Sequence, residues 1–419
     1  MKLLVSAYAC IPHRGSEPGH GWNWTLENAK LGYSVWCFTT PEGREVITKE
    51  MKNYPELDIT FIYIDVPRWV NYMYRFQPFV YFHYLYWQRK AAREAQRLDK
   101  KVNFDAILHA SMESFQLGSG MWRLNKPFIF GPVGGGSFPP RAFKDYFYGE
   151  WRTEIIRRWT SNLLLLFNRN IRALSKKALI IVANTDTRKM AEEAGATRIV
   201  SYLDVGLPKS FFPDEIPQRN NDEVLRLLWV GRIFPRKGLP LVLEALSKVR
   251  DDVPFQLTII GDGSHGHLVP GLLRQYGLET RATWRGQVPW EEVRRAYLDH
   301  HAFIFCSLRD TFGSQYLEAM AYALPIISLN HQGAGDHIPD DAGVKVPVTT
   351  PEETTKGIAH AVEYFFDHPE ERARFGIRGF EFSNNHNWEA KARWMSQLFP
   401  SILRKEDTPQ DDGPSDPSR

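Results

Sequence analysis

Short apolar runs alternate with longer, helix-patterned segments along most of the chain. The first half contains six such runs, at residues 2–8, 34–40, 58–65, 104–111, 127–135 and 178–185. The second half contains six more, at residues 224–232, 255–263, 282–288, 301–307, 324–330 and 342–348. Continuous apolar runs of this length are typical of parallel strands that are buried on both faces of a sheet. The pattern therefore predicts two doubly wound, Rossmann-like α/β domains in tandem.

The domain boundaries are predicted from the composition of the segments. Residues 206–222 are rich in proline and polar residues and are predicted to be a linker between a first domain at 1–205 and a second domain at 223–385. A helical segment at 386–404 is expected to cross back to the first domain, and residues 405–419 have the composition of a disordered tail. Ligands of such sheets bind beyond the carboxyl ends of the strands, so the two domains are expected to face an interdomain cleft.

Composition excludes several classes of protein. With 419 residues and a net charge of +3, the chain is too long for one core and has no charge excess that would favour nucleic acid. Its three cysteines (Cys10, Cys37 and Cys306) have no CxxC spacing, which argues against a zinc site and for a reducing compartment. The first apolar run reaches polar residues too early for a signal peptide, and no run approaches the ~20 residues of a membrane span. A cytoplasmic enzyme is predicted.

The stretch "GRIFPRKG" (231–238) follows a predicted strand of the second domain and carries two cations. Arg232 and Lys237 lie on one strand-to-helix turn with a glycine at each end. Such a pair, where backbone can approach closely, suits a diphosphate. The alternative is a solvated basic loop, but the position at the end of a strand favours a ligand site.

The stretch "LRDTFGSQYLEAMAYALPIIS" (308–328) carries two carboxylates around a turn. Asp310 ends a predicted strand, residues 311–314 form the turn, and Glu318 lies about one turn inside the next helix. Free N–H groups at a helix N-terminus can hold an anion, while each carboxylate accepts hydrogen bonds from neutral hydroxyl groups. The alternative is that Asp310 only caps the helix and Glu318 is a surface acid.

The first domain offers weaker signals at strand ends. In "GSEPGHGWNW" (15–24), Gly15 and two further glycines allow a tight turn where a helix begins, and "FGPVGGGSFPP" (130–140) contains a flexible glycine loop. His109 lies where another strand ends. For each of these, a purely structural role is the alternative.

Other catalytic motifs are missing or weak. "GDGSHG" (261–266) matches G-x-G-x-x-G but has no acidic residue at the end of the next strand, and neither a P-loop nor a G-x-S-x-G elbow occurs. No complementary set of metal ligands and no D-x-D pair is present. A metal site is therefore not predicted.

The second half resembles retaining GT-B glycosyltransferases of glycosyltransferase family four (glycosyl transferases group 1). The matching motifs are "GRIFPRKG", "IIGDG", "RGQVPWEEV" and the acid–seven residues–Glu motif that continues into "LEAMAYALPII", in the order and spacing of the family. The stretches "SAYACIPHRGSEPGHGWNW" and "GPVGGG" resemble one subgroup. The resemblance implies the GT-B fold, with an acceptor-side first domain and a nucleotide-sugar-binding second domain.

The resemblance also implies residue roles. Arg232 and Lys237 would grip the diphosphate, Glu318 would bind the ribose, and Asp310 and His109 would contact the donor sugar; these make Arg232, Lys237, Asp310 and His109 the implied catalytic residues. The remaining implied donor-binding residues are Gly15, Gly231, Gly261, Val288, Gly313 and Ser314. The implied acceptor-side residues are Glu17, Gly134 and Gly135. One departure stands out, because the family usually has glutamate where this chain has Asp310.

The implied reaction moves a sugar from a nucleotide-diphosphate donor to a hydroxyl-bearing acceptor (a glycan, glycolipid or small molecule), with retention and without metal or cofactor. Cell-surface polysaccharide, glycolipid or specialised-metabolite glycosylation would be its setting. Two alternatives stay open: a two-domain NAD(P)-dependent oxidoreductase, and a non-catalytic protein that binds sugar nucleotides or glycans.

Two segments, 68–90 and 155–177, combine many aromatic or apolar residues with basic ones. Amphipathic basic segments can lie on an anionic membrane surface. They can equally be two helices packed on the first domain. A peripheral position on the inner face of the membrane is therefore one expectation for this chain.

Overall fold

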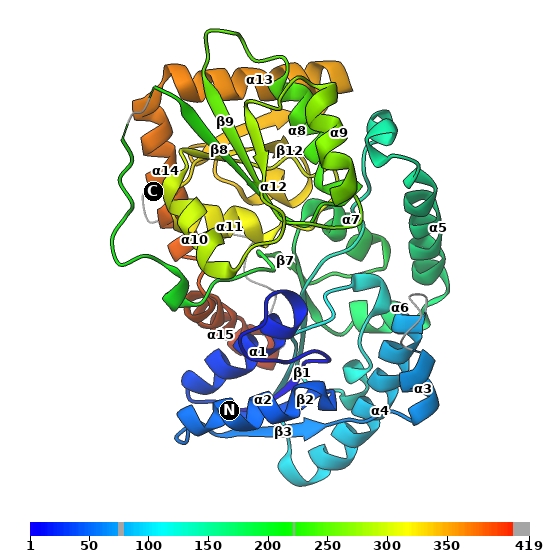
Figure 1. The fold of residues 1–419 in the computed structure, drawn as a ribbon. Helices are drawn as coiled ribbons and strands as arrows, with labels where there is room; N and C mark the ends of the chain where they lie inside the picture. The colour runs from blue at the N-terminus through cyan, green and yellow to red at the C-terminus, as the bar shows by residue number, and fades with distance from the viewer. Residues whose placement is uncertain (74–78, 221–222, 405–419) are drawn as a thin grey trace. The chain divides into compact units, whose positions relative to one another are not determined.

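The computed structural model describes residues 1–73, 79–220 and 223–404 (Figure 1). Contacts between Cα atoms divide the chain into two compact units. The first unit comprises residues 1–136, 160–206 and the C-terminal segment from residue 388, and the second comprises 137–159 and 207–387. Each unit contains one parallel β-sheet, so the predicted pair of Rossmann-like α/β domains is confirmed.

The sheet of the first unit has seven parallel strands in the order β3-β2-β1-β4-β5-β6-β7. These are β1 (Lys2–Ser6), β2 (Ser34–Thr39), β3 (Ile59–Tyr63), β4 (Ala106–His109), β5 (Phe128–Val133), β6 (Leu179–Val182) and β7 (Ile199–Ser201). Neighbouring side chains of β1 enter different cores, since Leu4 packs on one face of the sheet while Leu3 and Val5 pack on the other. Burial on both faces explains why these strands read as continuous apolar runs.

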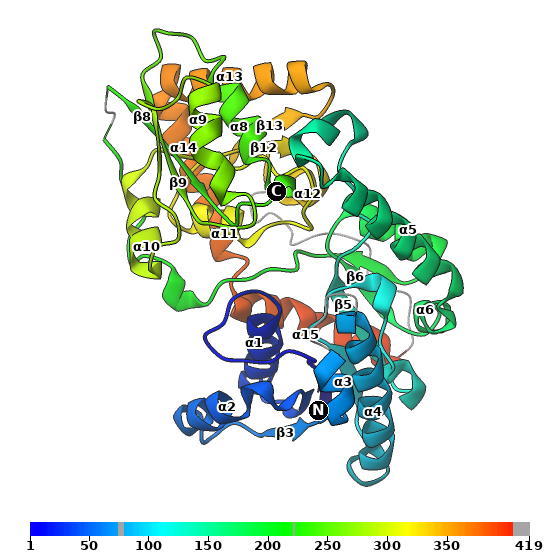
Figure 2. The ribbon, with the colours of Figure 1, turned by 45° about the vertical axis from the view of Figure 1, so that its right-hand side comes forward.

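Helices cover both faces of this sheet. They are α1 (Ser16–Lys30), α2 (Arg44–Glu50), α3 (Arg68–Met73), α4 (Phe79–Val102), the part of α5 (Trp151–Phe167) from residue 160, α6 (Arg169–Ser175), α7 (Thr185–Glu193) and α15 (Trp388–Arg404). Helices α1 and α15 lie side by side in both views (Figures 1 and 2). They share one core, in which the rings of Trp24 and Trp388 meet edge to face with centroids 5.5 Å apart.

The sheet of the second unit has six parallel strands in the order β10-β9-β8-β11-β12-β13. These are β8 (Leu225–Val230), β9 (Phe255–Ile260), β10 (Ala282–Trp284), β11 (Ala302–Ile304), β12 (Ile326–Asn330) and β13 (Gly343–Pro347). All six coincide with predicted apolar runs. Among the strands of the described residues, the sequence missed only β7 of the first sheet, a three-residue strand with one buried position.

The helices of the second unit pack around this sheet, with α11 beside α14 and α8 beside α13 (Figure 1). They are the part of α5 up to residue 159, α8 (Leu239–Leu246), α9 (Val269–Gln275), α10 (Trp290–Asp299), α11 (Ser314–Ala321), α12 (Gln332–His337), α13 (Pro351–Asp367) and α14 (Pro369–Asn384).

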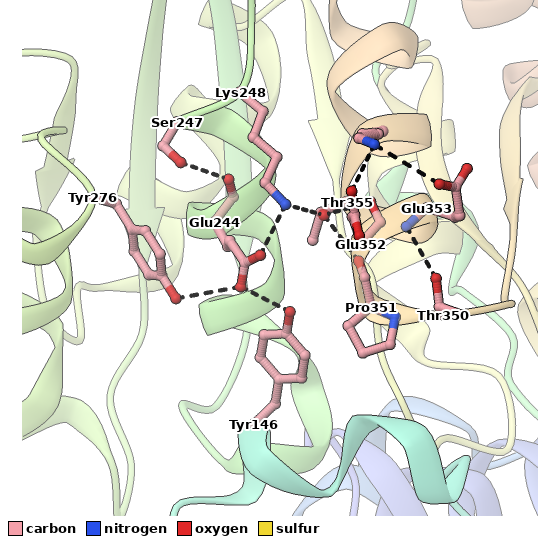
Figure 3. Close-up of polar contacts among 11 residues, drawn as sticks. Tyr146, Glu244, Ser247, Lys248, Tyr276, Thr350, Pro351, Glu352, Glu353 and Thr355 are labelled. Atoms are coloured by element: carbon pink, nitrogen blue, oxygen red, sulfur yellow. Dashed lines mark hydrogen bonds and ion pairs between the residues drawn. The ribbon is translucent and has the colours of Figure 1, made fainter.

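Residues 137–159 belong to the second unit, whereas the domain boundaries predicted from the sequence placed them in the first domain. Figure 3 shows polar contacts between this segment and the second unit: Glu244 on α8 accepts hydrogen bonds from Tyr146 at 2.8 Å and from Lys248 at 2.9 Å. Lys248 also donates to Thr355 on α13, at 2.5 Å. Polar contacts therefore tie this segment to the helices of the second sheet, whereas hydrophobic patterning reports only which residues are apolar.

The C-terminal helix predicted at 386–404 is α15, which the contacts assign to the first unit from residue 388. The tail predicted at 405–419 and residues 221–222 of the predicted linker lie outside the described residues. In the described part of the chain, no helix is both long and apolar enough to cross a membrane.

Candidate functional site

The loop after β8 is held against the end of β11 by a glycine. Gly238 has φ = 70°, and a Cβ atom on it would lie 2.0 Å from the carbonyl oxygen of Cys306. Only glycine permits both this left-handed conformation and this approach. Because Gly238 has no side chain, the short 3-10 helix Pro235–Lys237 can lie next to the segment that carries Asp310.

Lys237 and Asp310 form an ion pair at this edge of the second sheet. Lys237 is 6% exposed, and the Nη1 atom of Arg236 lies 3.5 Å from the second carboxylate oxygen of Asp310. Burial lowers the pKa of Lys237, although Asp310 opposes the shift. Burial would raise the pKa of Asp310, but Lys237 and Arg236 outweigh it and hold that pKa below its usual value. The carboxyl group of Asp310 is therefore ionised near neutral pH.

Three residues that the sequence did not single out hold this pair in place. Gln332 accepts a hydrogen bond from the backbone N–H of Asp310 at 2.9 Å and donates to the carbonyl oxygen of Phe138. Arg309 pairs with Glu154 of α5 at 3.0 Å, and burial lowers its pKa to about 10. Arg236, the third, was visible inside "GRIFPRKG" as a further cation, whereas nothing near Gln332 in the sequence signals its contacts.

Helix α11 begins directly after this pair. Gly313, with φ = 107°, precedes Ser314, the first residue of the helix, which therefore begins one residue earlier than the predicted turn at 311–314 allows. Glu318 lies one turn further and accepts a hydrogen bond from Tyr297 of α10 at 3.0 Å. Burial raises the pKa of Glu318, and hydrogen bonds from Tyr297 and Ser314 oppose the shift. The start of α11 thus has a carboxylate on either side, Asp310 before the helix and Glu318 within it.

The other predicted donor-side residues of the second unit lie at neighbouring strand ends. Gly231 follows β8 and Gly261 follows β9, so close together that a Cβ atom on Gly261 would lie 1.9 Å from the carbonyl oxygen of Gly231. Val288 is half-buried in the loop before α10. Arg232 is exposed, with its guanidinium 4.6 Å from the ring centroid of Phe234. The structure therefore joins Lys237 to Asp310 directly, and it leaves Arg232 at the surface of the same loop.

In the first unit, Glu17 ties together the loops that follow β1 and β4. Gly15 precedes α1, and in the first turn of that helix the Glu17 carboxylate accepts hydrogen bonds from the backbone N–H groups of Met112 at 2.5 Å and Glu113 at 2.7 Å. Burial and the neighbouring Glu113 raise the pKa of Glu17 to about 8. The carboxylate predicted for the acceptor side is thus engaged with backbone of its own unit.

The glycine loop after β5 is hydrogen-bonded to the loop after β4. The N–H of Gly134 donates to the carbonyl oxygen of Glu113 at 2.7 Å, and the carbonyl oxygen of Gly135 accepts from Thr187 at 2.8 Å. Three loops at the carboxyl ends of β1, β4 and β5 are therefore connected through hydrogen bonds.

His109, the last residue of β4, is 1% exposed. Its ring lies 5.0 Å from that of Phe130, and its Nε2 atom lies 3.3 Å from the carbonyl oxygen of Met112. Among the described residues, its Nδ1 atom has no hydrogen-bond partner. Burial lowers the pKa of His109 to about 4, so the imidazole is neutral at physiological pH.

The stability of the protein should depend on pH through His109. Its pKa is about 6.5 when unfolded and about 4 when folded, so its contribution is complete above pH 6.5 and is lost as the pH falls through 4. Relative to the His109→Asn variant, the wild type should lose about 3 kcal/mol of unfolding free energy over that interval. Urea unfolding of both proteins at several pH values measures this difference. A difference that stays constant with pH would contradict the assignment.

Comparison with known proteins identifies the second unit. Residues 212–382 match the family model described as Glycosyl transferases group 1. Residues 212–382 are a group 1 glycosyltransferase domain. The resemblance drawn from "GRIFPRKG" and the motif around Asp310 and Glu318 is confirmed, since both lie within the group 1 domain.

Curated relatives resemble parts of the chain. The GPI3 subunit of phosphatidylinositol N-acetylglucosaminyltransferase from Saccharomyces cerevisiae is 24% identical over 253 residues, which are 58% of this chain and 54% of that protein. Lipopolysaccharide 1,6-galactosyltransferase from Salmonella typhimurium is 31% identical over 117 residues, or 27% of this chain and 32% of that protein. The chain thus spans about half or less of the length of these relatives.

Solved structures resemble the whole chain in fold. Sucrose-phosphate synthase from Thermosynechococcus elongatus has a TM-score of 0.66 and 19% identity, with 97% of this chain and 100% of that chain covered. HepE from Anabaena, in a complex with UDP, has a TM-score of 0.62 and 14% identity, with 96% and 100% covered. The two-sheet architecture around the group 1 domain is therefore that of GT-B glycosyltransferases.

Proposed function

We propose that this protein is a glycosyltransferase that moves a sugar from a nucleotide-diphosphate donor to a hydroxyl acceptor with retention at the anomeric carbon. The observation that carries the proposal is the buried Lys237–Asp310 pair at the start of α11, inside the group 1 domain. It provides a cation for phosphate, a carboxylate for sugar hydroxyls and helix-terminal amides beside them. Solved relatives whose structures contain UDP support a nucleotide donor.

The chemistry requires stabilisation of a leaving group. As the bond between the anomeric carbon and the diphosphate oxygen breaks, negative charge grows on the phosphate oxygens. Lys237 and Arg232, together with the amides near Gly313 and Ser314, would stabilise that charge. A donor phosphate oxygen would accept the proton of the acceptor hydroxyl as its oxygen bonds to the same face of the sugar. The nucleoside diphosphate then leaves, and the anomeric configuration is retained.

The remaining predicted residues fill binding roles in this proposal. Glu318, with its raised pKa, would accept a hydrogen bond from a ribose hydroxyl, and Gly231, Gly261 and Val288 would line the donor site. In the first unit, His109 would contact the donor sugar through its free Nδ1 atom. Gly15 would approach the phosphates, while Gly134, Gly135 and the loop held by Glu17 would serve the acceptor.

The proposal needs neither a metal nor a cofactor, because Lys237, Arg232 and the backbone amides supply the electrophilic groups. A panel of UDP-, GDP-, ADP- and dTDP-sugars tests it, with nucleotide release and ligand-induced shifts in melting temperature as readouts. We expect one donor to raise the unfolding free energy by about 2.7 kcal/mol at a hundredfold excess over its Kd. Nucleotide release should persist in EDTA, and NMR of the product should show the anomeric configuration of the donor.

Other outcomes would replace the proposal. Binding of a sugar nucleotide without release, in the presence of a broad set of acceptors, would indicate a non-catalytic binding protein. Absorbance changes of NAD(P)H with a carbonyl substrate would indicate an oxidoreductase. Loss of nucleotide release in EDTA, restored by Mg²⁺, would contradict metal independence, and an inverted product would contradict retention.

We also propose that the protein works in the cytoplasm, in part at the inner face of a membrane, on glycan or glycolipid acceptors. Support comes from three free, buried cysteines and from the exposed aromatic side chains Trp69, Tyr72 and Tyr81 in the basic segment at 68–90. Residues 74–78 of that segment lie outside the described residues. Cell fractionation with antibody detection, before and after a high-salt wash, tests this part.

A further inference from the structure

An apolar pocket in the first unit is not used by the proposed reaction. It has a volume of about 470 Å³ and lies between helices α4, α5 and α6 and the loop around Gly118. Its apolar lining comes from Phe82, Leu85, Tyr86, Leu163, Leu164 and Phe167. A pocket of this size and chemistry is typical of a small-molecule site rather than of packing between helices.

The mouth of the pocket carries apolar side chains that reach solvent. On α5, Leu163 is 57% exposed and Phe167 is 71% exposed, although both line the pocket. On α3 and α4, Trp69 and Phe82 lie with ring centroids 6.0 Å apart and are 55% and 40% exposed. Apolar patches of this kind, continuous with a cavity, mark surfaces that bind a partner.

Two arginines line the same pocket without a carboxylate to neutralise them. Arg89 of α4 and Arg123 are both pocket residues, and within the described chain neither forms an ion pair. Burial, and then the charge of Arg89, lower the pKa of Arg123, so the two guanidinium groups lie close enough to repel each other. Arg123 donates to the side-chain oxygen of Asn170 at 2.5 Å. This contact fixes its direction but does not balance its charge.

The two features together select the chemistry of the ligand. An apolar cavity favours a hydrocarbon chain, since each buried CH₂ group contributes about 0.8 kcal/mol. Two uncompensated guanidinium groups favour an anion, and phosphate is the anion whose geometry suits arginine. A polar sugar nucleotide would satisfy the arginines but not the aromatic and leucine lining.

We propose that this pocket binds one acyl chain of an anionic membrane phospholipid, with the phosphate head group at Arg89 and Arg123. The lipid would hold the first unit at the membrane surface, and the exposed side chains at the mouth would enter the bilayer interface around it. This extends the membrane part of the proposed function and does not depend on sugar transfer.

Co-sedimentation with vesicles tests the proposal through matched pairs of variants. Leu163 and Leu166 lie on the same helix and are similarly exposed, at 57% and 61%, but only Leu163 lines the pocket. With vesicles of 30% phosphatidylglycerol and 70% phosphatidylcholine, we expect Leu163→Asp to weaken binding at least tenfold and Leu166→Asp less than threefold. If α5 only adsorbed on the membrane, both variants would lose binding equally, and the proposal would be wrong.

A second pair tests the head-group site. Arg89→Glu should weaken binding to the anionic vesicles at least tenfold, whereas Lys100→Glu makes the same change of charge on α4 outside the pocket and should have less than a threefold effect. Arg89 is exposed, so this variant should fold even if Leu163→Asp does not. Equal binding of the wild type to pure phosphatidylcholine vesicles would overturn the assignment of the arginines.

Calorimetry below the critical micelle concentration tests occupancy of the pocket without a bilayer. Dihexanoylphosphatidylglycerol should saturate one site on the wild type, and Leu163→Asp should abolish this binding. Absence of saturable binding would overturn the proposal. Because neither measurement uses a sugar nucleotide, a negative result here is distinct from failure of the proposed transferase.

Discussion

Replacing Lys237 with alanine is expected to lower kcat/KM by about 100-fold or more, on the scale seen when one preorganised donor to a developing oxyanion is removed. Lys237 is almost fully buried, and its ammonium is paired with Asp310, so its position is fixed before any donor arrives. A fixed charge needs no reorganisation during the reaction, which is why its removal should be costly. Steady-state nucleotide release with the preferred donor measures the effect.

Controls separate catalysis from folding. Arg236 also contacts Asp310, at 3.5 Å, but is less buried than Lys237, so Arg236→Ala should lower kcat/KM by about tenfold or less. Lys237→Ala leaves Asp310 without its main partner, which costs stability by about 3 kcal/mol. Adding Asp310→Asn should restore part of this stability without restoring activity. Near-normal turnover of Lys237→Ala would contradict the assignment of this pair to the donor site.

Replacing Gly238 with alanine is expected to destabilise the group 1 domain by about 2–5 kcal/mol. A left-handed conformation costs a non-glycine residue about 1–2 kcal/mol, and overlap of the new Cβ with a neighbour costs about 1–3 kcal/mol more. At Gly238 both apply, since φ is 70° and the Cβ would lie 2.0 Å from the oxygen of Cys306. Relief of the overlap would move Lys237 away from Asp310, so activity should fall as well.

Gly277 provides the matched control for this substitution. Its φ is 64°, but a Cβ atom on it would meet nothing within 4 Å. Gly277→Ala should therefore cost only the conformational part, about 1–2 kcal/mol. Urea denaturation of both variants measures the difference. Equal destabilisation of the two would show that contact with Cys306 plays no part.

The fold could be predicted from the sequence because its signals are local. Strands buried on both faces read as apolar runs, so twelve of the thirteen strands in the described part of the chain could be located without coordinates. The assignment of residues 137–159 to the second unit could not be predicted, because it involves a hydrogen bond from Tyr146 to Glu244, 98 residues away. Hydrophobic patterning carries no information about such a pair.

The candidate site could likewise be predicted only in part. Residue types at strand ends, such as Lys237 and Asp310, could be found from motif spacing. Their ion pair could not, because it joins residues 73 positions apart through the glycine at 238. Glu17 illustrates the same limit, since motif spacing does not reveal that its carboxylate accepts hydrogen bonds from backbone 95 and 96 residues away. Whether a polar group already has a hydrogen-bond partner within the protein depends on the tertiary structure.

The packing of α15 on α1 also sets an order of events during translation. The first unit lacks the side chains that cover Trp24 until residue 388 and its successors have been made, after all of residues 207–387. At about 5–20 residues per second, the nascent chain would wait roughly 10–40 s with this aromatic face uncovered. Newly made chains thus spend that interval with an apolar surface open to chaperones, and the ribosome completes both units almost at the same moment.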